Sequence, residues 1–381
     1  MTALLEHSHG AGVPIQTRYQ RLRSANVADF PPISAREEQW RYLNPARLKG
    51  LDADSLVEFS GSIFIEASSG VVTEVVGSEH KLFGHAGLPE ERPSAAAWQS
   101  AKSAQLVSMP ANEKSTATVS IDSKDASPAA LHLIIEAQKF ANGLVILDHK
   151  GDAVLSENVE IIVQDEASLT VVSIQDWNDQ SVHASTQMAK LGRNAKLKHV
   201  VVSLGGETVR VSSSTEFTAP GAETEMLGMY FADSGQYLEN RLYVDHAVPS
   251  CKSRVTYKGA LQGEKAHTVW VGDVLIRMAA EDTDTYELNR NLLLTEGARA
   301  DSVPNLEIET GKIAGAGHAS ASGRFDDEQL FYLQARGIPE LEARRLVVRG
   351  FLNEIIQQID DESLRERLTN AIEAELEKSG S

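Results

Sequence analysis

The middle of the chain is a succession of short apolar runs separated by turn residues. From about residue 115 to 318 the runs are rich in Val, Thr, Ser, Ile and Leu, and Gly, Asn, Asp and Ala interrupt them. Almost no stretch sustains the period of an amphipathic helix, whereas short runs rich in β-branched residues favour strands. We therefore predict that this part of the protein is all β.

A degenerate phrase, a small turn pair followed by alternating residues, recurs within this region. Its copies lie at residues 166–171, 194–200 and 221–227, with a related phrase at 297–303. The alanines of the first three copies, Ala167, Ala195 and Ala222, are 28 and then 27 residues apart. Regular spacing of this length without intervening helices is typical of a solenoid, in which each coil buries its apolar face against the next. An antiparallel sandwich, whose turns recur about every 8–12 residues, is the alternative.

The end of the chain, residues 321–381, has a helical pattern. Acidic residues from Asp326 to Glu328 suit a first turn, Gly337 suits a helix end, and Pro339 suits the start of the next helix. Apolar residues then recur on one face of each of two segments: Leu341, Val348, Phe351 or Leu352, Ile355 and Ile359, followed by Leu364, Leu368, Ile372 and Leu376. We predict a helical cap whose apolar stripes pack on the β core or on another protein.

The N-terminal part is less regular. Residues 34–43 have a helical pattern in which Ser34 is the expected N-cap and Glu37 its capping-box partner, with Trp40 and Leu43 on one face. Residues 51–105 alternate short apolar runs with Gly, Ser and Pro. We expect an N-terminal helical or mixed α/β module at 1–110, a β-solenoid core at 111–320 and a C-terminal helical domain at 321–381.

Charge and length narrow the functional classes. The 381 residues include 36 Lys and Arg against 54 Asp and Glu, a net charge of −18. Such a chain repels nucleic acid and anionic lipid, so we expect neither as a partner. Met1 to Gly10 have no signal-peptide pattern, and no apolar run is long enough to cross a bilayer, so a cytoplasmic protein is expected.

Cysteine content and phosphate-binding motifs exclude further classes. Cys251 is the only cysteine, so the chain forms no internal disulfide and has no self-contained cysteine-ligated metal or cluster site. No Gly-x-x-x-x-Gly-Lys-Ser/Thr loop occurs, so we do not expect this chain to bind and hydrolyse ATP. We find no flavin fingerprint either, although the sequence leaves flavin binding open.

Several long runs, in the same order, resemble the signature of the SufB/SufD family of iron-sulfur cluster assembly scaffolds, and the match is strong from about residue 235 to 357. The runs are VDHAVPSCKSR at 244–254, YKG at 257–259, NRNLLLTEGARADSVPNLEIE at 289–309, GHA at 317–319, GRFDDEQLFYL at 323–333 and RGI at 336–338. A short element at 40–42, WRY, is similar to SufD-type members. Ordered long motifs are far more specific than one short pattern.

The resemblance implies a right-handed parallel β-helix core with N- and C-terminal helical parts. It also implies a SufB-type partner bound through the β-helix and a SufC-type ATPase bound by the C-terminal part. Such a complex assembles iron-sulfur clusters and delivers them to apoproteins. Whether the isolated chain forms a homodimer is left open.

His318 is the first candidate site residue. It lies among small residues and matches a histidine that SufD-type members place at the interface with SufB, where it could ligate iron of a transient shared cluster or move a proton. The alternative is an interfacial histidine held by hydrogen bonds. Some relatives have a cysteine two residues earlier, where this chain has Ala316, so a cluster would depend more on thiolates from the partner.

Weaker candidates come from two other regions. Cys251 could handle sulfur, but a lone cysteine is more often a small buried apolar residue. His246 and His267 flank it in sequence, could lie on neighbouring coils, and are expected to be structural. Arginine and tyrosine are favoured at interfaces, and the candidates for docking the ATPase are Tyr332, Arg336, Arg344, Arg345 and Arg349, the alternative being a solvated charged face.

The sequence therefore indicates an accessory scaffold subunit without turnover chemistry of its own. Two alternatives are a SufB-type scaffold proper and a β-helix carbohydrate-active enzyme. The short chain, its single cysteine and Ala316 weigh against the first. The second would need clustered carboxylates on one solenoid face.

Overall fold

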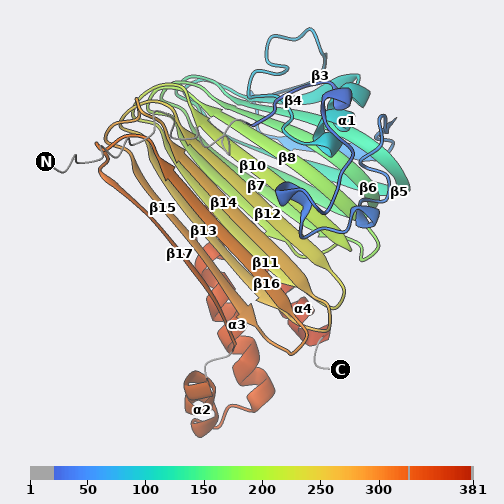
Figure 1. The fold of residues 1–381 in the computed structure, drawn as a ribbon, viewed down its shortest axis with the longest axis vertical. Helices are drawn as coiled ribbons and strands as arrows, with labels where there is room; N and C mark the ends of the chain where they lie inside the picture. The colour runs from blue at the N-terminus through green and yellow to red at the C-terminus, as the bar shows by residue number, and fades with distance from the viewer. Residues whose placement is uncertain (1–20, 325–326, 379–381) are drawn as a thin grey trace, which may run out of the picture.

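The protein winds into a parallel β-solenoid in which successive strands alternate between two facing sheets (Figure 1). The structure is a computed structural model and describes residues 21–324 and 327–378. Two long strands, β5 (Lys114–Ala137) and β6 (Asn142–Val163), begin in the first sheet and end in the second. Because every pairing among strands β5 to β17 is parallel, the predicted solenoid is confirmed and the antiparallel sandwich is excluded.

The remaining strands divide between the two sheets. The first sheet contains β2 (Ser62–Ala67), β7 (Ser168–Trp177), β9 (Lys196–Ser203), β11 (Glu223–Ala232), β13 (Lys252–Leu261), β15 (Asp284–Leu293) and β17 (Gly315–Arg324). The second contains β1 (Val57–Glu58), β3 (Val72–Gly77), β4 (Ser103–Met109), β8 (Val182–Leu191), β10 (Thr208–Phe217), β12 (Tyr237–His246), β14 (His267–Ile276) and β16 (Arg299–Ile308). Only β2 with β5 and β3 with β4 pair antiparallel among the described strands.

The sequence repeat corresponds to the coil of the solenoid. Ala167, Ala195 and Ala222 each directly precede a strand of the first sheet, in matching register, and all three are buried. They form a ladder of small residues at one corner. The fourth phrase, at 297–303, belongs instead to the second sheet, because Arg299 pairs in register with His267.

Alternate residues of each strand fill the space between the sheets, as the two-residue period of a strand requires. The tightest packing involves two tyrosines and two glycines on β11 and β13. Tyr257 lies over Gly228 and Tyr230 lies over Gly259, each at its register partner. A Cβ atom on either glycine would lie 1.9 Å from the tyrosine ring, so no larger residue fits at these positions.

The N-terminal part covers the outer side of the second sheet. Its described residues, from 21 onward, contain α1 (Arg92–Ser100) and three short 3-10 helices at Val27–Asp29, Glu38–Trp40 and Pro45–Leu48. Residues of this part and of the second sheet share apolar clusters. Residues 1–20 of the predicted N-terminal module lie outside the described residues.

The predicted helix at 34–43 is wrong. The Ser34 hydroxyl accepts a hydrogen bond from the Arg36 N–H at 3.3 Å, which closes a local turn and does not start a helix. Glu37 becomes the N-cap of a three-residue 3-10 helix and makes no side-chain cap. Trp40 and Leu43 are nevertheless buried on one side, as their spacing predicts.

The C-terminal helices are α2 (Asp327–Ala335), α3 (Glu340–Ile356) and α4 (Glu362–Lys378), and α3 and α4 lie against the outer side of the first sheet. Gly337 takes a φ of +87° between α2 and α3, and Pro339 is the N-cap of α3, as predicted. Asp326 lies outside the described residues. The apolar stripes pack on the β core, except that Leu341 is exposed.

Lys258 of β13 fixes α3 to the sheet. Its buried Nζ donates to the Phe351 carbonyl at 3.2 Å and forms an ion pair with Glu354.

None of the described helices is long and apolar enough to cross a membrane.

Candidate functional site

The last coil leaves the solenoid open at one end. Among the described strands, β16 pairs only with β14 and β17 only with β15, so each has one edge without a partner strand. In Figure 1, β17 lies at the margin of the solenoid farthest from α1. Unpaired strand edges present free N–H and C=O groups and are templates for pairing with another chain.

His318 lies on this open edge. It is exposed and pairs in register with Glu287 of the neighbouring strand β15. Alternate residues of β17 after it face the space between the sheets: Ser320 donates a hydrogen bond to Ser302 of β16 at 2.7 Å, and Ser322 accepts one from Asn291 at 3.1 Å. Because side chains alternate along a strand, His318 belongs to the same inward row, at the rim of the opening.

A buried carboxylate lies in the coil beneath His318. Glu287 is 1 % exposed, and neither of its oxygens has a hydrogen-bond partner among the described residues. Desolvation, together with the negative charge of Asp273, raises the pKa of Glu287 to about 8. Sequence reasoning missed this residue. A signal is present, because Thr285, Glu287, Asn289 and Asn291 are polar at every second position of β15, and all four are buried.

Cys251 lies in the corner ladder and not on the surface. It directly precedes Lys252, the register partner of Glu223, and so occupies the position that Ala222 has one coil earlier. Its Sγ lies 3.6 Å from the carbonyl oxygens of Ala219 and Pro249. Burial raises the pKa of the thiol, which disfavours the reactive thiolate.

The two histidines near Cys251 in sequence do not come together. His246 ends β12 and contacts Ser253 Oγ through Nε2 at 2.9 Å, whereas His267 begins β14 and contacts Asp301 at 2.7 Å. The two strands are neighbours, but these residues lie at opposite ends of the pairing.

The candidates for docking an ATPase divide into two groups. Tyr332 is 55 % exposed on α2, and the Arg336 guanidinium lies 4.5 Å from the centre of its ring. Phe331, the residue before Tyr332, is 71 % exposed and was not singled out from the sequence. On α3, Arg344 pairs with Glu340 and Arg349 pairs with Glu373 of α4, while Arg345 is half-buried.

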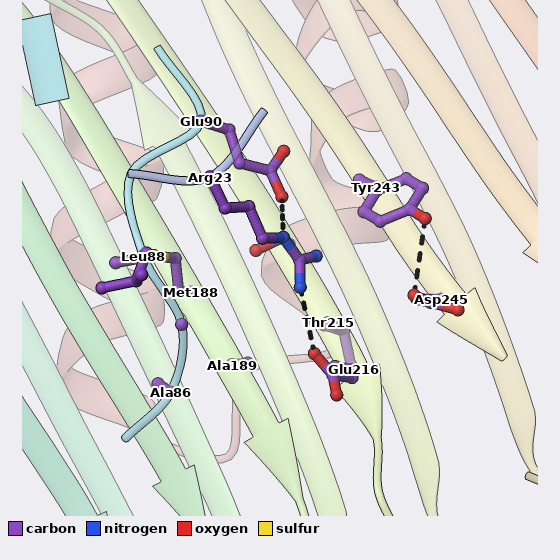
Figure 2. A pocket seen from close by; sticks show the side chains of 12 residues that line it. Arg23, Ala86, Leu88, Glu90, Met188, Ala189, Thr215, Glu216, Tyr243 and Asp245 are labelled. Carbon is purple, nitrogen blue, oxygen red and sulfur yellow. Dashed lines mark hydrogen bonds and ion pairs between the residues drawn. The ribbon is translucent and has the colours of Figure 1, made fainter. Parts of the chain in front are cut away.

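A hollow between the N-terminal segment and the second sheet is a weaker candidate. Figure 2 shows Arg23 between Glu90 and Glu216, at 2.9 and 3.5 Å, with Tyr243 and Asp245 beyond. Asp245 in turn binds Arg277. The charged groups of this hollow are thus paired with one another, and we assign it no ligand.

Comparison with known proteins identifies the family. Residues 119–351 match the model of the SUF system FeS cluster assembly SufBD core domain. An iron-sulfur cluster assembly SufBD family protein of Mycobacterium tuberculosis is 50% identical over 93% of this chain and 92% of its own length. One of Mycobacterium leprae is 50% identical over 96% of both chains.

A second SufBD family protein of Mycobacterium leprae is 26% identical over 62% of this chain, which spans only 27% of that relative. The core-domain match covers more than half of the chain, and the matches at 50% identity extend over nearly all of it. The chain therefore belongs to the SufBD family of iron-sulfur cluster assembly proteins.

Proposed function

We propose that this chain is a SufD-type accessory subunit that pairs with a SufB-type scaffold through the open end of its solenoid. The observation that carries the proposal is the pair of unpartnered edges on β16 and β17, with His318 exposed between the sheets. A second parallel-coil protein could extend both sheets there by main-chain hydrogen bonds. A cluster assembled at this junction would draw on His318 and on ligands of the partner.

The ligand chemistry of the chain favours an accessory role. Ala316, at the site of a cysteine in some relatives, provides no thiolate, and Cys251 is buried in the corner ladder. Iron-sulfur clusters are held mainly by thiolates, so the partner must supply them. The existence of a second, longer SufBD protein in Mycobacterium leprae supports a pair of unlike subunits.

The ATPase would bind at α2 and the start of α3. Phe331, Tyr332 and Leu341 are exposed there, at 71, 55 and 50 %. Exposed aromatic residues beside arginine form the usual anchors of an interface. In this proposal the subunit lies in the cytoplasm, performs no turnover of its own, and the SufC-type partner hydrolyses ATP.

Co-expression with the SufB- and SufC-type proteins of the same source tests the proposal. We expect one complex on size-exclusion chromatography with mass determination, and an absorbance of the cluster that is lost in His318→Ala. His85→Ala, at an exposed histidine of the N-terminal part, is the matched control and should change nothing.

Three outcomes would contradict parts of the proposal. Elution of the chain alone would reject both partners. A complex that keeps its cluster in His318→Ala would reject the role of His318. A cluster held by this chain without the longer SufBD protein would make it a SufB-type scaffold instead.

A further inference from the structure

Two histidines and a glutamate meet inside the solenoid, far along the chain from the open end. His149 and Glu157 both belong to β6, on either side of the bend where this strand passes from the first sheet to the second. Gly151 makes the bend with a φ of +89°, and a Cβ atom there would lie 2.0 Å from the Ser123 carbonyl oxygen. His183 lies on the neighbouring strand β8.

The three side chains converge although none of them is exposed. His149 Nε2 lies 3.0 Å from Glu157 Oε1, and His183 Nε2 lies 3.5 Å from Glu157 Oε2. One nitrogen or oxygen atom from each residue lies within 4.8 Å of the other two. Ligand atoms about 2.0–2.1 Å from a tetrahedral zinc ion are separated by about 3.3 Å. The two histidine–carboxylate distances, 3.0 and 3.5 Å, lie close to this value.

Neighbouring groups orient both imidazoles toward the carboxylate. His149 Nδ1 lies 2.9 Å from the Ile174 carbonyl oxygen, so Nδ1 carries a proton, and in the neutral imidazole Nε2 has the lone pair that faces Glu157. This is the arrangement that a backbone carbonyl imposes on metal-binding histidines. Ser185 donates a hydrogen bond to Glu157 Oε2 at 2.8 Å and orients the carboxylate.

His183 has an unused nitrogen. Its Nδ1 has two contacts that require different tautomers: a protonated Nδ1 donates a hydrogen bond to Gln175 Oε1 at 2.6 Å, whereas an unprotonated Nδ1 accepts one from the Trp177 indole N–H at 3.1 Å. The shorter contact favours the proton on Nδ1. Its Nε2 is buried, and its nearest polar contact among the described residues is Glu157 Oε2 at 3.5 Å, too long for a good hydrogen bond. Buried nitrogen atoms without a partner are rare and call for an explanation such as an ion.

We propose that His149, Glu157 and His183 bind one divalent transition-metal ion, of the Zn²⁺ or Fe²⁺ class, inside the solenoid. Two imidazoles and one carboxylate are a donor set that suits both ions. The ion would neutralise the buried carboxylate and bind the lone pair that His183 Nε2 has when Nδ1 donates to Gln175. In the competing arrangement, a proton on His149 Nε2 neutralises Glu157, and because this proton and a metal need the same lone pair, the two arrangements exclude each other.

The test is metal retention by the full chain, prepared without a histidine tag. The protein is unfolded with a chelator, refolded with Zn²⁺ or Co²⁺, desalted and analysed for metal by mass spectrometry. We expect about one ion per chain, d–d absorption bands of low-symmetry Co²⁺, and a zinc absorption-edge spectrum with imidazole scattering and no sulfur. Glu157→Gln and His183→Gln should each lower retention at least about tenfold.

His199→Gln is the matched control, because His199 is also buried between the sheets and binds Gln187 instead of the three residues. It should keep the ion, with circular dichroism confirming that each variant folds. If the refolded wild type retains no stoichiometric metal, or if both ligand variants retain as much as His199→Gln, the site is a structural ion pair only. Should the ligand variants fail to fold, the zinc spectrum of the wild type decides, since a shell without imidazole overturns the proposal.

Discussion

Glu287 and His318 are register partners on adjacent parallel strands, one buried and the other exposed. Both belong to the row of residues that faces the space between the two sheets. The carboxyl group therefore lies directly beneath the rim of the opening. Its strand, β15, still has β17 beside it, whereas β17 has one edge without a described partner strand. Whatever binds at His318 comes close to a group whose protonation changes near neutral pH.

The raised pKa of Glu287 predicts a stability that depends on pH. The folded state holds the proton up to a pH of about 8, whereas the unfolded chain releases it near 4.5. Between these values the folded state binds more protons, so stability falls as pH rises, by at most about 1.4 kcal/mol per pH unit. Glu287→Gln should remove this dependence and raise the free energy of unfolding at pH 8, measured by urea denaturation.

Glu296→Gln is the control for this measurement, because the Glu296 side chain is 91% exposed. It should leave the pH dependence unchanged. Equal slopes for wild type and Glu287→Gln would show that the carboxylate is ionised in the folded protein.

The corner ladder predicts how Cys251 responds to substitution. Its counterparts in earlier coils are alanines, so Cys251→Ala should fold normally and lose only about 1 kcal/mol of stability. Cys251→Leu should cost about 1–3 kcal/mol more, because the corner cannot accept a larger side chain.

In the wild type a thiol reagent should react only after unfolding, since burial raises the thiol pKa. Rapid reaction of the native protein, together with loss of cluster assembly in Cys251→Ala, would instead indicate a sulfur-handling role.

The exposed aromatic residues of α2 predict a separation of binding from stability. Tyr332→Ala and Phe331→Ser should each weaken binding of the SufC-type protein by roughly 2 kcal/mol, or about 30-fold, if they are central to the interface. The melting temperature should not change, because both side chains are exposed. Titration calorimetry and a thermal scan measure the two effects. Phe140→Ser, at an exposed aromatic residue between β5 and β6, is the control, and an equal loss of binding there would reject α2 as the docking site.

The solenoid was predictable because its constraints are local and repeated. Ala167, Ala195 and Ala222 occupy the same tight corner in successive coils. Because the corner requires a small residue, alanine recurs in the sequence at a regular interval. The apolar stripes of α3 and α4 are readable for the same reason. The helix predicted to begin at Ser34 does not form. The Ser34 hydroxyl can either cap a helix or close a local turn, and the sequence alone does not decide between these two arrangements.

The contacts between buried polar residues were harder to predict from the sequence. His318 was found because it lies in a motif of the family signature, but its neighbour Glu287 is 31 residues away and becomes a neighbour only through strand register. His183 and Glu157 likewise meet across two strands. Register depends on coil lengths, which vary with each loop, so the sequence indicates polar alternation within a strand but not which polar residues face each other.

The contacts of Arg210 predict that this residue stabilises the packing of the N-terminal part on the solenoid. Its buried guanidinium pairs with Glu91 at 2.8 Å and with Glu239 at 2.5 Å, and lies 4.1 Å from the centre of a Trp40 ring. Arg210→Met would leave the buried Glu91 without its cation and Glu239 with Arg241 alone, at 3.1 Å, and should lower the free energy of unfolding by about 3–5 kcal/mol.

The pH dependence of this loss identifies its cause. In the wild type, burial opposes ionisation of Glu239, but the charge of Arg210 prevails and lowers its pKa, so this stabilisation is present above the ordinary glutamate pKa and is lost as pH falls. Without Arg210, Glu239 binds a proton more readily in the folded state, so the difference in unfolding free energy between variant and wild type should narrow toward acid pH. Adding Glu91→Gln and Glu239→Gln to Arg210→Met should recover part of the loss at pH 7, because the amides carry no charge. If the loss of unfolding free energy does not vary with pH, and if Glu91→Gln and Glu239→Gln do not recover any of it, then Arg210 acts through its packing on Trp40.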